Sequence, residues 1–102
     1  MENESMAGEV DSLSELITDT MAKIEIRLNR MLTEDDAKYV HKWLGEYHFG
    51  MEIIDQAFMQ CWGYGRVNIV AMDSFLIPWH ENKLLTVKQV RIFEKEQGRK
   101  VF

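Results

Sequence analysis

Three features of the sequence predict an all-α protein, a compact bundle of about five helices. Apolar residues recur every three or four positions, and no stretch keeps the alternation of a half-buried strand. The 102 residues include one proline and six glycines, so few positions interrupt a helix. Hydrophobic residues make up 46% of the chain and charged residues 28%, a balance typical of a globular domain rather than of a disordered chain.

The first half of the chain predicts two helices. Residues 1–10 are polar and are expected to be disordered. The first helix then covers about residues 11–31. Its apolar stripe consists of Leu13, Leu16, Ile17, Thr20, Ile24, Leu28 and Met31. Thr33 is expected to cap a second helix that stops near Gly50, because its hydroxyl can accept a backbone N–H and acidic residues follow in the first turn.

A third and a fourth helix follow, separated by a glycine-containing turn. The third is predicted over about residues 51–62 and is ended by Gly63, which can take the left-handed conformation that a helix C-terminus favours. Asn68 is expected to cap the fourth helix. The inward-facing line of this fourth helix is Ile69, Met72, Leu76 and Trp79.

A fifth helix is predicted from a capping-box pattern, in which Thr86 and Gln89 each bond the other's backbone N–H. Gly98 is expected to close this helix. The domain is therefore placed at residues 11–97, and residues 98–102 are expected to form a basic tail.

The only proline of the chain, Pro78, lies inside the predicted fourth helix. Pro78 withholds a hydrogen bond from the carbonyl of Ser74 and disfavours helical geometry at Ile77. This predicts a kink or a helix end at about Ile77. Two interpretations of Trp79 stay open: a contact residue aligned with Phe75, or a large residue that closes the core between the fourth and fifth helices.

The charges are distributed unevenly along the sequence. Residues 1–20 contain six acidic and no basic side chains, whereas residues 83–102 contain six basic and two acidic ones. An anionic partner would therefore meet the C-terminal end of the chain. The alternative is an ordinary solvated helix face.

The sequence lacks the motifs of an enzyme or a metal protein. No nucleophile–base pattern is present, and we expect a non-enzymatic protein without a cofactor. The spacing of His41, His48 and His80 does not correspond to a zinc site. Cys61 is the only cysteine, which excludes an internal disulfide and favours a buried thiol in the reducing cytoplasm. No apolar run approaches the length of about 20 residues that a membrane span requires.

Four stretches, "RMLTEDDAKYVHKWL", "EIIDQAF", "GRVNIVAMDSFLIPW" and "LLTVKQV", together resemble the DnaD-like domain of bacterial and phage replication-initiation proteins. The resemblance covers about residues 16–93. It rests on the order and spacing of Arg30, Leu32, Thr33, Trp43, Ile53, Ile54, Ala57, Asn68, Phe75, Leu76, Trp79 and Thr86.

The resemblance implies a helical module that binds DNA and assembles with other proteins when the replicative helicase is loaded. The family has a Tyr-x-x-x-Ile-x-x-x-Trp pattern on its late helix, associated with DNA contact. Here Ala71 stands at the tyrosine position, Phe75 at the isoleucine position, and Trp79 matches. Combined with the basic end, this gives as candidate DNA-binding residues Phe75, Trp79, Lys83, Lys88, Arg91, Lys95, Arg99 and Lys100.

The resulting hypothesis is a replication-initiation accessory module of Gram-positive bacteria or their phages. It would bind single- or double-stranded DNA weakly and without sequence preference, together with replication initiator or helicase-loading proteins. Ile26 lies off the main stripe of the first helix and would be available for self-association. The alternative is a protein–protein adaptor of the same fold that does not bind DNA, which is consistent with the alanine at position 71 and with the net charge of −5.

Overall fold

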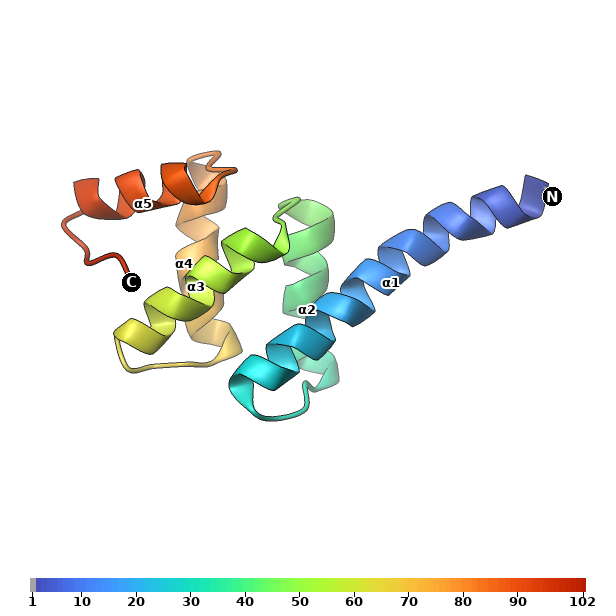
Figure 1. Ribbon diagram of the computed structural model, residues 1–102, viewed down its shortest axis with the longest axis horizontal. Coiled ribbons are helices and arrows are strands. Elements are labelled where there is room, and N and C mark those ends of the chain that lie inside the picture. The colour runs from blue at the N-terminus through green and yellow to red at the C-terminus, as the bar shows by residue number, and fades with distance from the viewer. Residues whose placement is uncertain (1) are drawn as a thin grey trace. The chain divides into compact units, whose positions relative to one another are not determined.

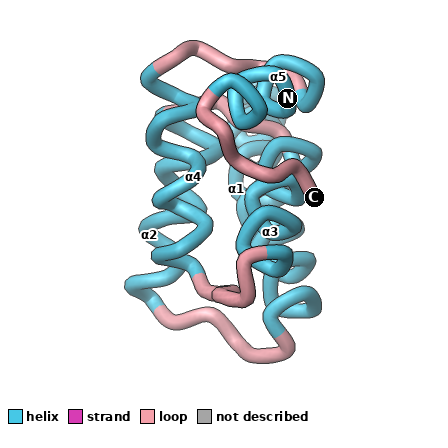
Figure 2. Tube along the Cα trace, turned by 90° about the vertical axis from the view of Figure 1, so that its left-hand side faces the viewer, coloured by secondary structure: helices cyan, strands magenta, loops and turns pink. Residues whose placement is uncertain are grey.

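The computed structural model describes residues 2–102, and the side chains from Ser12 onward (Figure 1). It contains the helices α1 (Glu2–Leu28), α2 (Glu34–His41), α3 (Met51–Gly63), α4 (Ile69–Glu81) and α5 (Val87–Glu96), with a π-helical turn, η1 (Lys42–Glu46), after α2. The described residues contain helices and loops but no strand (Figure 2). The predicted all-α class with five helices is confirmed.

The chain divides into two compact units, residues 1–41 and residues 42–102. The first unit is the helical hairpin of α1 and α2. The second unit contains η1, α3, α4 and α5, with α3 packed against both α4 and α5. The domain boundaries predicted at residues 11 and 97 stay predictions, as does disorder over residues 1–10, whose side chains lie outside the described part.

The turn of the first unit is built from two local motifs. α1 ends at Leu28, three residues before the predicted boundary, and Asn29 takes a left-handed φ of 55°. The predicted cap at Thr33 is confirmed, since its hydroxyl accepts from the N–H of Asp36 at 3.2 Å. The Asp36 carboxylate in turn accepts from the N–H of Thr33 at 2.9 Å and from Arg30 at 2.8 Å. Two side chains thereby fix where α2 begins.

The second predicted helix divides into α2 and η1 before the chain reaches Gly50. The N–H of Tyr47 donates to the carbonyl of Lys42 at 2.9 Å, a five-residue step that defines the π-turn. His48 then has a φ of 59°, and α3 begins at Met51. The predicted stop near Gly50 is therefore present, whereas the π-turn was not predicted.

The prediction that Gly63 takes the left-handed conformation is wrong, because that role belongs to Gly65, with a φ of 79°. The N–H groups of Gly65 and Arg66 return to the carbonyls of Trp62 and Cys61, at 3.1 and 3.0 Å. Gly63 instead stays in α3, where a Cβ atom would overlap the ring of Phe102. The position therefore requires glycine for space rather than for backbone conformation.

α4 begins as predicted and passes through its proline. Asn68 accepts from the N–H of Ala71 at 2.7 Å, which confirms the cap. The helix continues to Glu81, so of the two predicted outcomes at Ile77 the helix end is wrong, and the kink stays a prediction. Ser74, whose carbonyl loses its partner, is exposed to water, which can hydrate that carbonyl.

α5 follows the predicted pattern at both ends. The Thr86–Gln89 capping box is present, with both bonds at 3.1 Å. Gly98 closes the helix with a φ of 75°. Val90 is buried, while Val87 and Phe93 are partly exposed.

The interior of the second unit is largely aliphatic but contains two tryptophans. The fully or almost fully buried side chains include Trp43, Phe49, Ile53, Ile54, Ala57, Cys61, Ile69, Met72, Leu76, Trp79 and Val90. The predicted burial of Cys61 is confirmed, and this burial raises the pKa of its thiol to about 11. The thiolate, which is the reactive form, is therefore scarce at neutral pH.

Lys83 provides a test of backbone strain. It follows α4 with a φ of 57°, which is costly for a residue with a Cβ atom. Lys83→Gly is expected to raise the free energy of unfolding by about 0.5–1 kcal/mol. This is the strain that glycine relieves in the folded state, minus the conformational entropy that glycine adds to the unfolded state. Urea denaturation measures the change. Lys83→Ala removes the same charge but keeps the strain, so an equal gain in that variant would contradict the explanation.

Asp36 makes the stability depend on pH. Its hydrogen bonds with Arg30 and with the N–H of Thr33 hold the pKa of Asp36 below its ordinary value of 3.8. Because the pKa is lower in the folded state, the carboxylate stabilises the fold above pH 4, and this contribution is lost as the pH falls through the folded pKa. Asp36→Asn should therefore be less stable than the wild type at pH 7, and the difference should shrink between pH 4 and pH 2. A pH-independent difference in urea denaturation would exclude this role.

Candidate nucleic-acid interface

The outer face of α5 carries three cations in one line. Lys88, Arg91 and Lys95 are spaced three and four residues apart, which places them on the same side of the helix. All three are exposed, and among the described residues none of them forms an ion pair. We call these three residues the α5 basic face. Ile92 lies among them and is 49% exposed.

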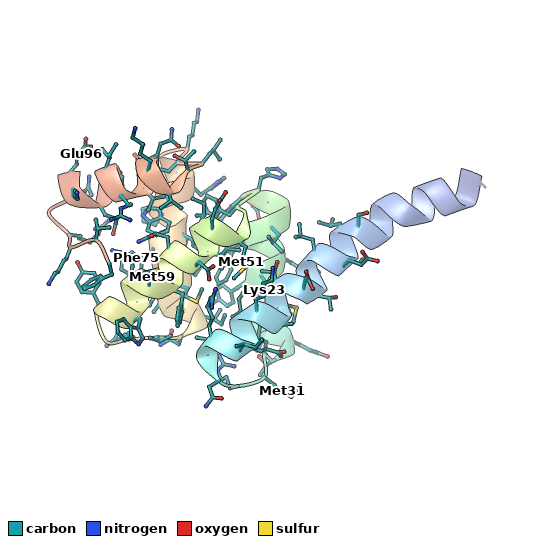
Figure 3. All side chains as sticks on the ribbon, in the orientation of Figure 1. Lys23, Met31, Met51, Met59, Phe75 and Glu96 are labelled. Carbon is teal, nitrogen blue, oxygen red and sulfur yellow. The ribbon has the colours of Figure 1, made fainter. Side chains whose placement is uncertain are left out.

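The opposite face of α5 fixes the helix against the second unit. Val90 and Glu94 are one turn apart and are both fully buried. The inward pair therefore holds the α5 basic face toward solvent. Glu96 is the one exposed acidic side chain within α5, and it points away from α3 (Figure 3).

Glu94 is a carboxylate with no exposure to water, and four donors surround it. Arg99 contacts both carboxylate oxygens, through Nε at 2.9 Å and Nη2 at 2.6 Å. The indole N–H of Trp79 donates to Oε2 at 3.2 Å, and the amide of Gln60 lies 3.4 Å from Oε1. The hydrogen bond with Glu94 raises the pKa of Arg99 despite the opposing effect of burial.

These contacts place two of the predicted DNA-binding residues in structural roles. Trp79 is fully buried, so its position corresponds to the alternative in which it closes the core between α4 and α5. Arg99 is the other of these candidate DNA-binding residues. Its guanidinium instead balances a buried charge, and releasing it would leave Glu94 uncompensated.

The other predicted residues of α4 lie between the core and the surface. Phe75 is partly exposed, and its ring centroid lies 6.0 Å from that of Trp79 and 6.1 Å from that of Tyr64. Ala71 lines an open hollow of about 500 Å³ together with Arg66, Asn68, Val70 and Ser74. The alanine at the family's tyrosine position thus leaves space rather than an aromatic ring.

Lys83 and Lys100 remain exposed. Lys83 lies in the turn before α5, and the side chain of Lys100 lies over the Phe102 ring, with 5.6 Å from Nζ to the centroid. The structure therefore leaves five of the six predicted cations exposed, whereas the sixth, Arg99, is partly exposed and pairs with the buried Glu94.

A second buried carboxylate, Asp73, was not predicted. It accepts from the indole N–H of Trp43 at 2.9 Å and forms an ion pair with Lys42 at 2.9 Å. Burial alone would lower the pKa of Lys42, but the hydrogen bond and charge of Asp73 outweigh that effect and raise it. In the sequence, Asp73 follows Met72 of the inward-facing line on a largely apolar helix, and this position could have indicated a buried acid.

The burial of Gln56 and Gln60 was also not predicted. They are four residues apart on α3, beside the apolar line, and hydrogen-bond each other at 3.3 Å. Glu94 had a clearer signal, because it continues the inward line of Val87 and Val90 and so places a charge where an apolar residue is expected.

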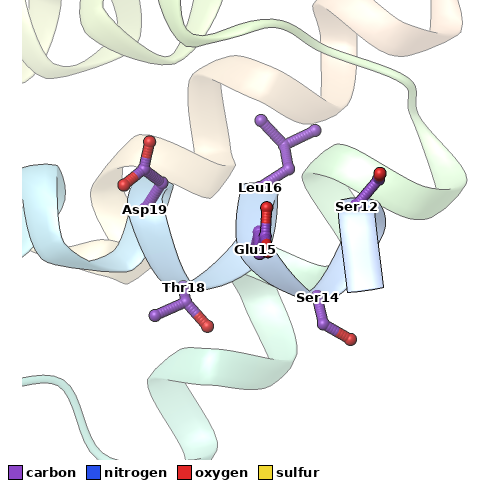
Figure 4. Close-up of a pocket in the computed structure, with 6 residues that line it drawn as sticks. All are labelled: Ser12, Ser14, Glu15, Leu16, Thr18 and Asp19. Atoms are coloured by element: carbon purple, nitrogen blue, oxygen red, sulfur yellow. The ribbon is translucent and has the colours of Figure 1, made fainter. Parts of the chain in front are cut away.

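No other part of the described chain forms a convergent chemical site. A hollow of about 670 Å³ beside α1 is lined by Ser12, Ser14, Glu15, Leu16, Thr18 and Asp19. These residues belong to one helix and point to different sides of it (Figure 4). Within the described residues, no three His, Cys, Asp or Glu side chains are grouped as metal ligands. None of the described helices is long and apolar enough to cross a membrane.

Substitution of Trp79 tests its place in the core. Trp79→Ala should lower the free energy of unfolding by about 3–5 kcal/mol, the usual cost of removing a large buried aromatic side chain. Trp79→Phe keeps a ring but removes the donor to Glu94, and should cost less, about 1–3 kcal/mol. Urea denaturation gives both values. A loss below about 1 kcal/mol for Trp79→Ala would contradict the core position.

Comparison with known protein families gives a match over residues 21–97, to the family described as replication initiation and membrane attachment. No curated protein and no solved structure matches the chain. The family match covers three quarters of the chain, from within α1 to the end of α5, and implies a role in replication initiation. The chain therefore belongs to the DnaD-like replication initiation and membrane attachment family, as the order of its motifs predicts.

Proposed function

We propose that this chain is a non-enzymatic replication-initiation module that binds the DNA backbone through the α5 basic face. The observation that supports this most directly is the line of three exposed cations without an ion-pair partner among the described residues. Cations that are already solvated and unpaired can contact phosphates without breaking an interaction in the protein.

The spacing of the α5 basic face suits a phosphate backbone. Lys95 lies seven positions after Lys88, which corresponds to about 10.5 Å along a helix. This length is sufficient for the line to reach neighbouring phosphates of one DNA strand. No acidic or amide side chain in this line suggests reading of base edges, and we expect binding without sequence preference.

The balance of charge between the two units supports contact through the second unit. Residues 1–41 contain ten acidic and four basic side chains, whereas residues 42–102 contain seven acidic and eight basic ones. In the second unit, two of the acidic side chains, Asp73 and Glu94, are buried in ion pairs. The net charge of the whole chain, −5, predicts weak binding that is sensitive to salt.

Neutralising the α5 basic face tests the proposal. The triple variant with Lys88→Gln, Arg91→Gln and Lys95→Gln should bind fluorescent double-stranded DNA more weakly than the wild type. The slope of log K against log salt should flatten by up to about 2.7, at about 0.9 per lost phosphate contact. Fluorescence anisotropy at several salt concentrations gives both quantities, and single-stranded DNA provides a second substrate.

Two matched variants control for nonspecific effects of charge. Lys23→Gln removes an exposed cation of α1 and should leave the slope unchanged. Glu96→Gln removes the exposed acid of α5 and should strengthen binding without removing a contact. If the triple variant has the wild-type slope, the α5 basic face does not contact phosphates.

The second candidate function is a protein–protein adaptor that does not bind DNA. It is favoured by Ala71 at the family's tyrosine position and by large apolar side chains on the surface. Ile26 is 78% exposed, as expected from the sequence, and Trp62 is 70% exposed. In this case the partners would be replication initiator or helicase-loading proteins of the cytoplasm, or a second copy of the chain. Wild-type protein that shows no salt-dependent DNA binding would support this function.

A further inference from the structure

Residues 99–102, which we call the strap, turn back after α5 and lie along α3. The turn is made at Gly98, where the N–H of Arg99 donates to the carbonyl of Glu94 at 2.9 Å. The two views of the chain agree that this last segment returns to α3 (Figures 1 and 2). The strap has no regular secondary structure of its own and depends on side chains of α3 and α5.

Side chains of α3 bind the main chain of the strap. Gln60 accepts from the N–H of Phe102 at 2.8 Å and donates to the carbonyl of Lys100 at 2.9 Å. Gln56 donates to the carbonyl of Phe102 at 3.0 Å, and the hydroxyl of Tyr64 accepts from the N–H of Lys100 at 2.9 Å. The side-chain amide of Gln60 thus bonds the N–H and the C=O that flank Val101. A neighbouring β-strand would make the same pair of hydrogen bonds to the main chain.

Two side chains of the strap, three residues apart, are bound in addition. The Arg99 guanidinium pairs with both oxygens of the fully buried Glu94. The Phe102 ring lies against Gly63, where no Cβ is tolerated, and meets the Tyr64 ring edge-on at 5.1 Å. The middle of the strap is less constrained, since Val101 is partly exposed and Lys100 is exposed.

We propose that this surface, formed by Gln56, Gln60, Gly63, Tyr64 and Glu94, is a recognition site for an extended segment of a partner protein. The segment would have an arginine followed three residues later by an aromatic residue. The strap occupies the site within the same chain and is displaced when such a segment binds. This goes beyond the proposed DNA contact, because the site lies on α3 and on the buried side of α5, away from the α5 basic face.

The chemistry of the site favours a peptide over other ligands. Four hydrogen bonds are made to main-chain atoms and would be offered to any extended peptide. Selectivity comes from the buried carboxylate and from the glycine that leaves room for a ring. A strap held in the same chain competes at a high effective concentration, so binding in trans becomes strong only when the strap is weakened.

The test uses the full chain and a fluorescent peptide, Gly-Arg-Lys-Val-Phe, capped at both ends. Phe102→Ala removes the ring that occupies the site and should bind the peptide at least ten-fold more tightly than the wild type, measured by fluorescence anisotropy. Adding Gly63→Ala to that variant should abolish the gain, because the new Cβ fills the ring position. Alanine is also the better helix former, so this second change does not weaken α3.

Substitutions in the fluorescent peptide test the proposal on the wild-type protein, so the result does not depend on whether the Phe102→Ala protein folds. On the wild-type chain at high peptide concentration, replacing the peptide's phenylalanine by alanine, or its arginine by glutamate, should abolish the residual binding. Equal affinity of wild type and Phe102→Ala, or no effect of Gly63→Ala, would overturn the proposal. The proposal would also be overturned if wild-type and Phe102→Ala chains formed a dimer when mixed but neither bound the peptide. That result would mean that the site binds the strap of a second copy of the chain.

Discussion

The buried carboxylate of Glu94 is the interaction on which the second unit depends. It lies on α5 and receives donors from α4, through Trp79, from α3, through Gln60, and from the strap, through Arg99. An ionised group removed from water is tolerated only when its lone pairs are filled and its charge is balanced. Because each donor comes from a different segment, one carboxylate fixes the relative positions of three helices and the strap.

Asp73 on α4 is a second buried carboxylate with the same kinds of partner. A tryptophan N–H and a cation meet at the carboxylate, here from Trp43 and Lys42 of the π-turn. The π-turn places these two consecutive residues so that both reach the same acid, which explains why the helix does not continue regularly after His41. The tryptophans thus contribute hydrogen bonds as well as apolar volume.

The two buried pairs also determine which charges are available for function. Lys42 and Arg99 neutralise buried carboxylates. The three cations of the α5 basic face form no ion pair among the described residues. Membership of the replication initiation family and this free line of cations support the same proposal, a module that contacts the DNA backbone. The surface that binds the strap is separate from the α5 basic face, and the strap itself shows what kind of peptide would fit there.

The sequence by itself determined the class of the fold and most helix boundaries, because caps act within one turn of the chain. Thr33, Asn68 and the Thr86–Gln89 pair bond backbone groups three residues away, so their effect can be read locally. The order of these motifs was also enough to identify the family. Only the tertiary structure decided that Gly63 makes room for a ring, that Trp79 is buried, and that Arg99 serves the interior. Gly63 and Trp79 meet partners that are distant in the sequence, Phe102 and Glu94. Glu94 is only five residues from Arg99, but it is buried because α5 packs on the rest of the second unit. Helical periodicity carries no information about which distant side chain will meet a given face.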